Sequence, residues 1–305
     1  MAAEILQPSD KAIANAVSIL EDGGLVAIPT ETVYGLACDA ANSDAVARLY
    51  AAKGRPSFNP LIAHITDLPA AKREGTFSTT AEELAKAHWP GPLTLVVPVA
   101  DAHSVCDLAR AGLDSIALRS PSHPVARELL KAFSRPLVAP SANPSGKISP
   151  TRADHVLTDM GDAVDLILDG GPCKAGIEST IISCLTNPPT LLRPGSFDAS
   201  AFQAGSTDEA APSSPGQLAR HYAPEARLRL NASAPETGEA YLAFGHSTGT
   251  LNLSPSGDLI EAASNLFAMM RELDSKHDRI AVAPIPSEGI GAAINDRLAR
   301  AAKRD

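Results

Sequence analysis

The chain has 305 residues, of which 44% are apolar and 20% charged, and a formal net charge of −9 at pH 7. This composition is typical of a globular protein, and the acidic balance disfavours binding to nucleic acid through bulk electrostatics. No apolar run approaches the ~18 residues that span a bilayer. The length favours two domains, and a start without a basic, apolar leader predicts a cytoplasmic protein.

Short apolar runs alternate with amphipathic runs over the first part of the chain, which predicts an α/β domain. Strands are expected at GLVAIP, PLIAHI, LTLVVPV, SIALR, PLVAP, DLILDGG, STIISC and PTLLRPG. Helices are expected at 9–21, 43–53, 79–88, 124–133 and 152–160. Asn42 or Ser43 can cap the second of these helices, and Pro124 suits the first turn of the fourth.

The sequence changes character from residue 204, where AGSTDEAAPSSPGQ lacks periodicity and is typical of a linker. Beyond it, ARLRLNA, AYLAFG, TLNLS and RIAVAPI predict strands, and 258–274 and 288–302 predict helices. We therefore predict three parts: a first domain at 1–203, a linker at 204–224 and a small second α/β domain at 225–305.

Polar residues repeatedly follow the predicted strands of the first domain. In α/β sheets, ligands bind in the crevice beyond the strand ends. Each residue also has a purely structural explanation: the threonines can cap a helix, His64 can be a core histidine, and Arg119 an ion-paired rim residue. Repetition of the pattern favours a site. Its members are Thr30, Glu31, Thr32, His64, Arg119, Ser141, Asn143 and Arg193.

Two loops could hold an anion. In KGRPSFNPL (53–61), Gly54 and two prolines fix Lys53 and Arg55 in one loop, which suits a phosphate clamp, although cations at a helix C-terminus also complement its dipole. PSANPSGKISPT (140–151) is rich in hydrogen-bond donors. It is not a phosphate-binding Walker A loop, and the chain has no G-x-G-x-x-G motif.

One motif points to a different chemistry. GHSTG (245–249) matches the G-x-S-x-G elbow of hydrolases, with Ser247 as the nucleophile. The residues that follow it predict a strand instead of the required helix, and only Asp274 and His277 are near enough in sequence to complete a triad. We keep the hydrolase as an unfavoured alternative.

Several motifs occur in an order that resembles the YrdC-like threonylcarbamoyl-AMP synthases, in their two-domain form. They are PTETVYGL, KGRPSFNPL, WPGPLTLV, ALRSPSHP, APSANPSGKISPT, GIESTI and LRPGS, followed by SPGQLARHYAP and NLSPSGDLIEAASNLFAMMRELD. The resemblance covers nearly the whole chain, with Gln217 a small departure in the linker. It implies a YrdC-like twisted mixed sheet with helices, plus a smaller Rossmann-like α/β domain.

The resemblance also implies an activity. Such enzymes join L-threonine, bicarbonate or CO2, and ATP into threonylcarbamoyl-adenylate and pyrophosphate, with Mg²⁺ held mainly through the ATP phosphates and no dedicated protein metal site. A separate transferase then modifies adenosine 37 of tRNAs that read codons starting with A. No membrane partner and no strong direct binding to nucleic acid are implied.

Residue roles follow from the same resemblance. The threonine-binding residues would be Thr32, His64, Arg119, Ala139 and Ser179. The ATP-binding residues would be Arg55, Asn59, Ser115, Ser141, Ser149, Arg193 and Tyr222, and Lys53 would join Arg55 in catalysis. We expect Arg119 to grip the threonine carboxylate bidentately. The linker is expected to fold back as a lid that brings His221 and Tyr222 over the nucleotide.

The same fold could serve as an RNA-binding module that makes no adenylate, because a fold does not fix a function. The acidic composition disfavours this alternative. Retention of both the KGR loop and the threonine-side residues favours the enzyme.

Overall fold

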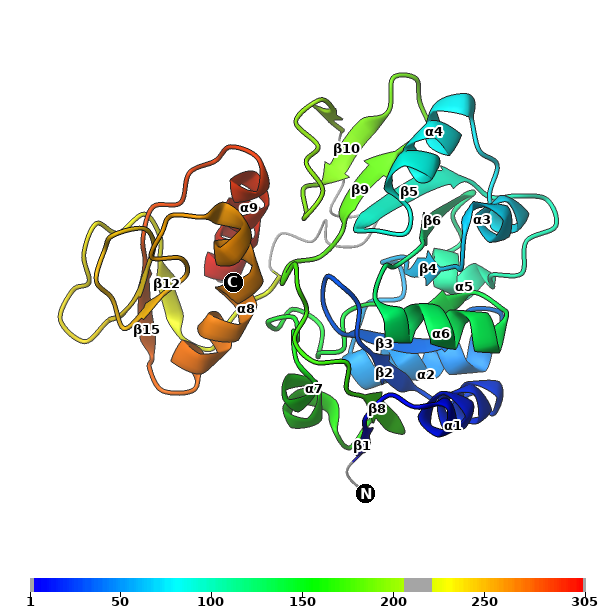
Figure 1. The fold of residues 1–305 in the computed structure, drawn as a ribbon, viewed down its shortest axis with the longest axis horizontal. Helices are drawn as coiled ribbons and strands as arrows, with labels where there is room; N and C mark the ends of the chain where they lie inside the picture. The colour runs from blue at the N-terminus through cyan, green and yellow to red at the C-terminus, as the bar shows by residue number, and fades with distance from the viewer. Residues whose placement is uncertain (1–2, 206–220, 304–305) are drawn as a thin grey trace.

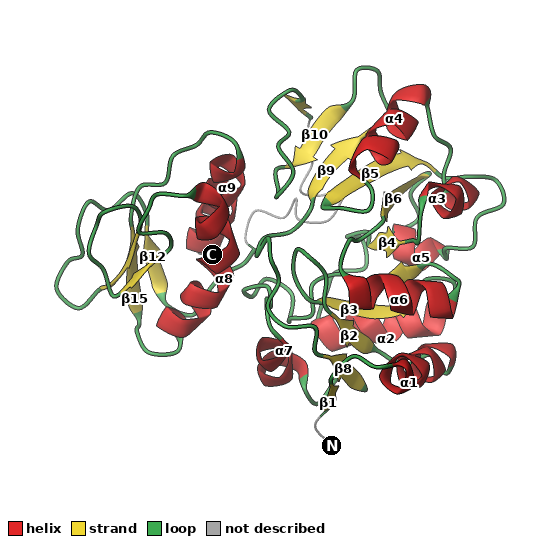
Figure 2. Ribbon diagram, in the orientation of Figure 1, coloured by secondary structure: helices red, strands yellow, loops and turns green. Residues whose placement is uncertain are grey.

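The computed structural model describes residues 3–205 and 221–303 and arranges them around two sheets (Figures 1 and 2). The larger sheet has 11 strands in the order β1-β8-β2-β3-β7-β4-β6-β5-β9-β10-β11. Parallel and antiparallel pairs are mixed in it. The mixed sheet predicted for the first domain is therefore confirmed.

Most elements of the larger sheet occur where the sequence predicts them. Its strands are β1 (Glu4–Leu6), β2 (Val26–Ile28), β3 (Gly35–Asp39), β4 (Ile62–His64), β5 (Leu93–Pro98), β6 (Ser115–Arg119), β7 (Leu137–Val138), β8 (Leu166–Leu168), β9 (Thr180–Ser183), β10 (Thr190–Arg193) and β11 (Gln203–Ala204). Its helices are α1 (Asp10–Glu21), α2 (Ser43–Lys53), α3 (Leu68–Glu74), α4 (Thr79–His88), α5 (Asp107–Arg110), α6 (Pro124–Phe133) and α7 (Ala153–Met160). The sequence did not predict β1, β3, β11, α3 or α5.

Local chemistry fixes the helix starts. The Asn42 side chain accepts hydrogen bonds from the amides of Asp44 and Ala45, so Asn42 is the cap of α2. Pro124 opens α6, where its missing N–H costs nothing. Both predicted roles are confirmed.

Two apolar layers cover opposite faces of the sheet. Val26 and Ile28 of β2 pack with α1 and α6, whereas Leu25 and Ala27 belong to the core that includes α2 and α7. Successive strand side chains point to opposite faces, so β2 supplies both cores. A strand buried on both faces is continuously apolar, as the run at 25–28 is.

β2 and β3 form an antiparallel pair joined by residues 29–34. Ile28 is opposite Gly35 and Val26 is opposite Ala37. The polar cluster PTETVY is therefore the loop of a β-hairpin and does not cap a helix. All of its residues are buried, which is unusual for a loop and requires each polar group to find a partner.

The second sheet has four parallel strands in the order β12-β15-β13-β14. They are β12 (Arg227–Arg229), β13 (Ala240–Ala243), β14 (Leu251–Asn252) and β15 (Arg279–Val282), with helices α8 (Leu259–Asp274) and α9 (Ile290–Ala302). Both helices lie between this sheet and the first domain (Figure 1). The predicted elements of the smaller domain are confirmed.

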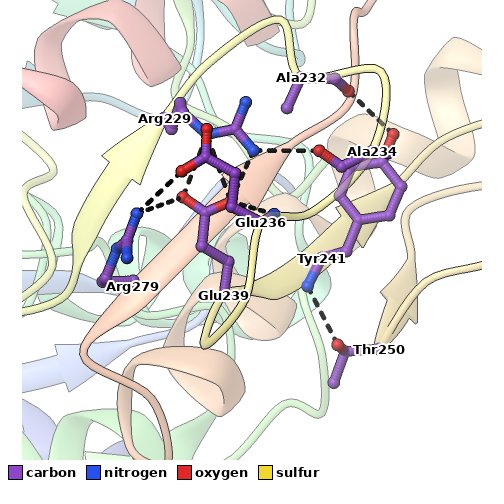
Figure 3. A network of polar contacts seen from close by, with 8 residues as sticks. All are labelled: Arg229, Ala232, Ala234, Glu236, Glu239, Tyr241, Thr250 and Arg279. Atoms are coloured by element: carbon purple, nitrogen blue, oxygen red, sulfur yellow. Dashed lines mark hydrogen bonds and ion pairs between the residues drawn. The ribbon is translucent and has the colours of Figure 1, made fainter.

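A network of charged side chains ties the loop after β12 to the start of β15 (Figure 3). Glu239 accepts hydrogen bonds from Arg229 and lies 3.2 Å from Arg279. Hydrogen bonding to Arg229 is the main reason why the pKa of Glu239 falls to about 2. The Tyr241 hydroxyl donates to the carbonyl of Ala232 and closes the same loop.

Two ion pairs join the helices of the second domain to the first. Arg271 of α8 lies 2.5 Å from Asp159 of α7, and Arg297 of α9 lies 2.9 Å from Glu178. Their side chains are largely buried, so the two domains meet at a polar junction. No helix among the described residues has the length and apolar character needed to span a membrane.

Candidate active site

A cavity that is partly open to solvent lies at this junction. It is lined by Thr32, Val33, Arg55, Ile62, His64, Arg119, Ala139, Pro140, Ser141, Glu178, Ser179, Arg193, His221 and Tyr222. All the residues predicted to bind threonine are among them. Most of the residues predicted to bind ATP are there too, although the chain brings them from segments far apart in sequence.

The hairpin loop 29–34 forms one wall of the cavity. The Thr30 hydroxyl donates to the carbonyl of Val33 at 2.6 Å and accepts from the amides of Thr32 and Val33. It also lies 2.8 Å from the Thr32 hydroxyl. Because Thr30 has only one hydroxyl proton, Thr32 is the donor in this last contact. Thr30 therefore holds the loop, and Thr32 faces the cavity.

Arg119 closes β6, and each of its three guanidinium nitrogens already lies beside an oxygen of the protein. Its Nη2 lies 2.7 Å from Glu31 Oε1, Nη1 donates to Thr32 Oγ1 at 2.9 Å, and Nε donates to the carbonyl of Gly91 at 3.2 Å. Burial alone would raise the pKa of Glu31, but the Arg119 charge and hydrogen bonds outweigh it, and the pKa lies below its ordinary value. The bidentate grip expected from the sequence is not free, because Glu31 occupies part of the guanidinium.

His64 ends β4 beside Arg119 and is almost fully buried. Burial, with the neighbouring Arg119 charge, lowers the pKa of His64 to about 3, so the ring is neutral at pH 7. Its Nδ1 lies 3.3 Å from the carbonyl of Ile62. A neutral ring that donates through Nδ1 keeps a lone pair on Nε2 for a donor in the cavity.

Ser179 connects the two ends of the cavity. Its hydroxyl lies 2.8 Å from that of Thr94, and Arg193 donates to both its carbonyl and its hydroxyl. Arg193 ends β10, and Ser179 directly precedes β9, so an antiparallel strand pair fixes both residues. Thr94 is a positioning residue that the sequence did not reveal.

Three buried cations lie around the other end of the cavity. Within the described part of the chain, Lys53, Arg55 and Arg193 have no carboxylate partner and donate only to neutral oxygens. Lys53 Nζ donates to the carbonyls of Ser141 and Asn143. Burial lowers the pKa of Lys53 well below its ordinary value and that of Arg55 to about 10. Buried charges without partners are costly, which indicates an anionic ligand.

Four predicted site residues lie outside the cavity lining. The Lys53 ammonium donates to the carbonyl of Ser141, a residue of the lining. The Ser149 hydroxyl donates a hydrogen bond to Glu178 at 2.5 Å. Asn59 is buried, and neither polar atom of its amide has a partner among the described residues. Ser115 begins β6, four residues before Arg119, and about 13 Å of extended chain separates them.

The described end of the linker enters the cavity. Residues 206–220 lie outside the described residues, but His221 and Tyr222 are both buried in the lining. The Tyr222 hydroxyl and His221 Nδ1 have no partner within the described ranges. Burial lowers the pKa of His221 to about 3, and the ring is neutral. Both groups are available to a ligand.

The predicted site lacked Glu178, whereas His221 was expected beside the nucleotide as part of the linker. Glu178 stands in GIESTI, directly before a strand, so its sequence position did carry a signal. Its role as partner of Arg297 could not be seen, because the two residues are 119 positions apart.

The structure gives no support to the hydrolase alternative. Ser247 lies exposed in the loop before β14, so a strand follows the motif where an elbow needs a helix. The Asp274 carboxylate accepts hydrogen bonds from the amides of Glu225 and Ala226, in a different part of the domain.

The fold and this cavity define a two-domain α/β protein whose cavity has one end with the Glu31–Arg119 ion pair and another end surrounded by Lys53, Arg55 and Arg193. The family model Sua5/YciO/YrdC, described as "Telomere recombination", matches residues 18–195. The model "Threonylcarbamoyl-AMP synthase, C-terminal domain" matches residues 177–303. The chain thus belongs to the Sua5/YrdC family of threonylcarbamoyl-AMP synthases, in the two-domain form.

Individual relatives agree over almost the whole length. The threonylcarbamoyl-AMP synthase of Bacillus subtilis is 38% identical, with 97% of this chain and 94% of the relative covered. The threonylcarbamoyl-AMP synthase of Pyrococcus abyssi is 37% identical, with 94% of this chain and 92% of the relative covered. The crystal structure of P. abyssi Sua5 complexed with L-threonine superposes with a TM-score of 0.90 at 34% identity, covering 99% of this chain and 98% of the other.

Proposed function

We propose that this protein is an L-threonylcarbamoyladenylate synthase, a nucleotidyltransferase that makes threonylcarbamoyl-AMP and pyrophosphate from L-threonine, bicarbonate or CO2, and ATP. The observation that carries the proposal is the charge distribution of the cavity. Its Thr32 end is charge-balanced by Glu31 and Arg119. At its other end, Lys53, Arg55 and Arg193 form no salt bridge among the described residues, and the nearby carboxylate of Glu178 is paired with Arg297.

The balanced end suits an amino-acid zwitterion. A threonine carboxylate there shares Arg119 with Glu31, and the Thr32 and Ser179 hydroxyls supply further hydrogen bonds. Neutral His64 can accept a bond from the threonine amine or hydroxyl through Nε2. The carbonyl of Ala139 completes the proposed threonine set.

The cationic end suits the triphosphate of ATP. Arg55 and Arg193 line the cavity, and Lys53 donates a hydrogen bond to the carbonyl of Ser141, which also lines it. The Asn59 side-chain amide and the Tyr222 hydroxyl have no hydrogen-bond partner in the described part of the chain, and we propose that they bind the rest of the nucleotide. Ser115, Ser141 and Ser149 complete the proposed ATP set.

The chemistry then requires positioning and charge stabilisation, without a covalent intermediate. Once the threonine amine has become a carbamate, a carbamate oxygen attacks the α-phosphorus and pyrophosphate leaves. Both reactants are anions, so Lys53 and Arg55 lower the barrier by offsetting their repulsion. Burial of His221 and Tyr222 keeps water from the labile product.

Magnesium fits this site as a companion of the nucleotide. No group of three or more His, Cys, Asp or Glu residues in the described ranges could hold a metal ion. Glu178, the carboxylate of the lining, is engaged by Arg297 and Ser149. We propose that ATP phosphates and water hold the ion, which supplies further neutralisation of phosphate charge.

We further propose a cytoplasmic location and delivery of the product to a tRNA threonylcarbamoyl transferase for adenosine 37 in tRNAs that read codons starting with A. The division into 1–203, 204–224 and 225–305 is part of the proposal. Such a protein has no membrane partner and needs no strong contact of its own with nucleic acid, which its net charge of −9 disfavours.

One assay tests the activity. The protein is incubated with ATP, threonine, bicarbonate and magnesium, and pyrophosphate is measured. We expect release that depends on threonine and bicarbonate. Absence of threonine-dependent release under all conditions would defeat the proposal and favour a binding module of the same fold.

A further inference from the structure

Arg297 of helix α9 is fully buried at the junction of the two domains. Its Nε donates to Glu178 Oε2 at 2.9 Å, and its Nη1 donates to the carbonyl of Pro194 at 2.7 Å. Pro194 directly follows Arg193 of the cationic end. A residue of the second domain therefore donates hydrogen bonds to two segments of the first domain that contribute to the cavity lining.

Glu178 extends this contact into the site. Its other oxygen, Oε1, accepts from the Ser149 hydroxyl at 2.5 Å. Burial alone would raise the pKa of Glu178, but the charges of Arg297 and Arg193 lower it, so the carboxylate is ionised at pH 7. An ionised carboxylate bonded on both oxygens is fixed in orientation. Glu178 also immediately precedes Ser179.

Tyr222 depends on the second domain in a different way. Its backbone has φ of +61°, a left-handed conformation that is strained for a tyrosine. Its ring stacks on Phe267 of α8 with centroids 5.5 Å apart, and the Arg297 guanidinium lies 5.3 Å from the ring centroid. These contacts hold the strained residue in a position where its hydroxyl is buried and has no partner within residues 3–205 and 221–303.

We propose that Arg297 is a positioning residue for the ATP end of the site. It fixes Glu178 and, through it, Ser149, and it supports the ring of Tyr222. Among the described residues, Arg297 makes no hydrogen bond or ion pair with Thr32, His64 or Arg119 of the threonine end, although Val33 of the hairpin loop packs into the apolar core of the second domain. The polar contacts of Arg297 thus support the nucleotide end, whereas the polar partners of Arg119 at the amino-acid end come from the first domain. This inference rests on the proposed function, because it assigns the cationic end to ATP.

The test uses full-length variants and measures KM for ATP and for threonine separately. Arg297→Lys keeps the charge but loses the planar guanidinium, which reaches Glu178 and Pro194 from two separate nitrogens. Arg297→Met combined with Glu178→Gln removes both charges of this pair, and Asp296, which also pairs with Arg297, keeps Arg300 as a partner. We expect the ATP KM to rise about tenfold or more, the size of losing about one good hydrogen bond to a charged group. The threonine KM should stay within about twofold.

A matched control is Arg229→Met, which breaks an ion pair inside the second domain, away from the cavity. It should leave both KM values unchanged. Thermal unfolding of every variant separates folding from positioning. A folded double variant with wild-type ATP KM, or one in which both KM values rise equally, overturns the proposal. Variants that fail to fold while Arg229→Met folds limit Arg297 to a structural role and overturn it as well. Failure of the wild-type protein to release pyrophosphate defeats the proposed function instead.

Discussion

Acid should destabilise this protein through two buried histidines of the site. His64 and His221 have pKa values near 3 in the folded protein, against an ordinary value of 6.5. The unfolded chain therefore binds protons more readily between pH 6.5 and 3, and stability falls as the pH drops through this range. Above pH 6.5 both forms are neutral, and the effect disappears.

The size follows from the shift. At pH 5, the pH is about 1.5 units below the pKa of an unfolded histidine, whereas both rings are still neutral in the folded protein. The free energy of unfolding therefore falls by about 2 kcal/mol per histidine. Together they remove about 4 kcal/mol, a large part of the ~5–15 kcal/mol that a domain has. The buried carboxylates Glu31 and Glu178 have lowered pKa values, so their contribution is lost only below about pH 4.5.

Denaturant unfolding at pH 7 and pH 5 measures the effect. Between pH 7 and pH 5, the free energy of unfolding should fall by about 2 kcal/mol less in His64→Gln, and likewise in His221→Gln, than in the wild type. His155 and His123 shift in the same direction but are present in all the proteins, so they cancel in the comparison. His246→Gln, at an exposed position, is the control. Equal losses in the wild type and both site variants would refute the reasoning.

Three further substitutions probe the site by steady-state kinetics. Arg119→Lys keeps a charge beside Glu31 but loses the guanidinium geometry, so the threonine KM should rise about tenfold with little change in the ATP KM. A rise in the ATP KM with an unchanged threonine KM would show that the two ends of the cavity are wrongly assigned. Lys53→Ala should lower kcat about a hundredfold, because it removes charge that stabilises the transition state; an unchanged kcat would exclude Lys53 from catalysis. Ser247→Ala should retain full activity, and a large loss would restore the hydrolase alternative.

The sequence by itself determined the α/β class and most helices and strands, and its resemblance to a known family named most of the residues that line the cavity. Apolar periodicity marks elements such as α6, and polar residues at strand ends mark Thr32, His64 and Arg119. It missed β3, because GLACD has no alternation and little β propensity. It also missed α5, which is only four residues long and too short to show a helical period.

Only the tertiary structure decided how these residues meet. The sequence left Glu31 and Thr30 ambiguous, and the fold makes Glu31 the ion partner of Arg119 and Thr30 the brace of the hairpin loop. It also brings Arg297 to Glu178 across 119 positions. Periodicity reports the neighbours of a residue along its own helix or strand, whereas contacts between distant segments depend on how whole elements pack. The charge balance of the two ends of the cavity is set at that level.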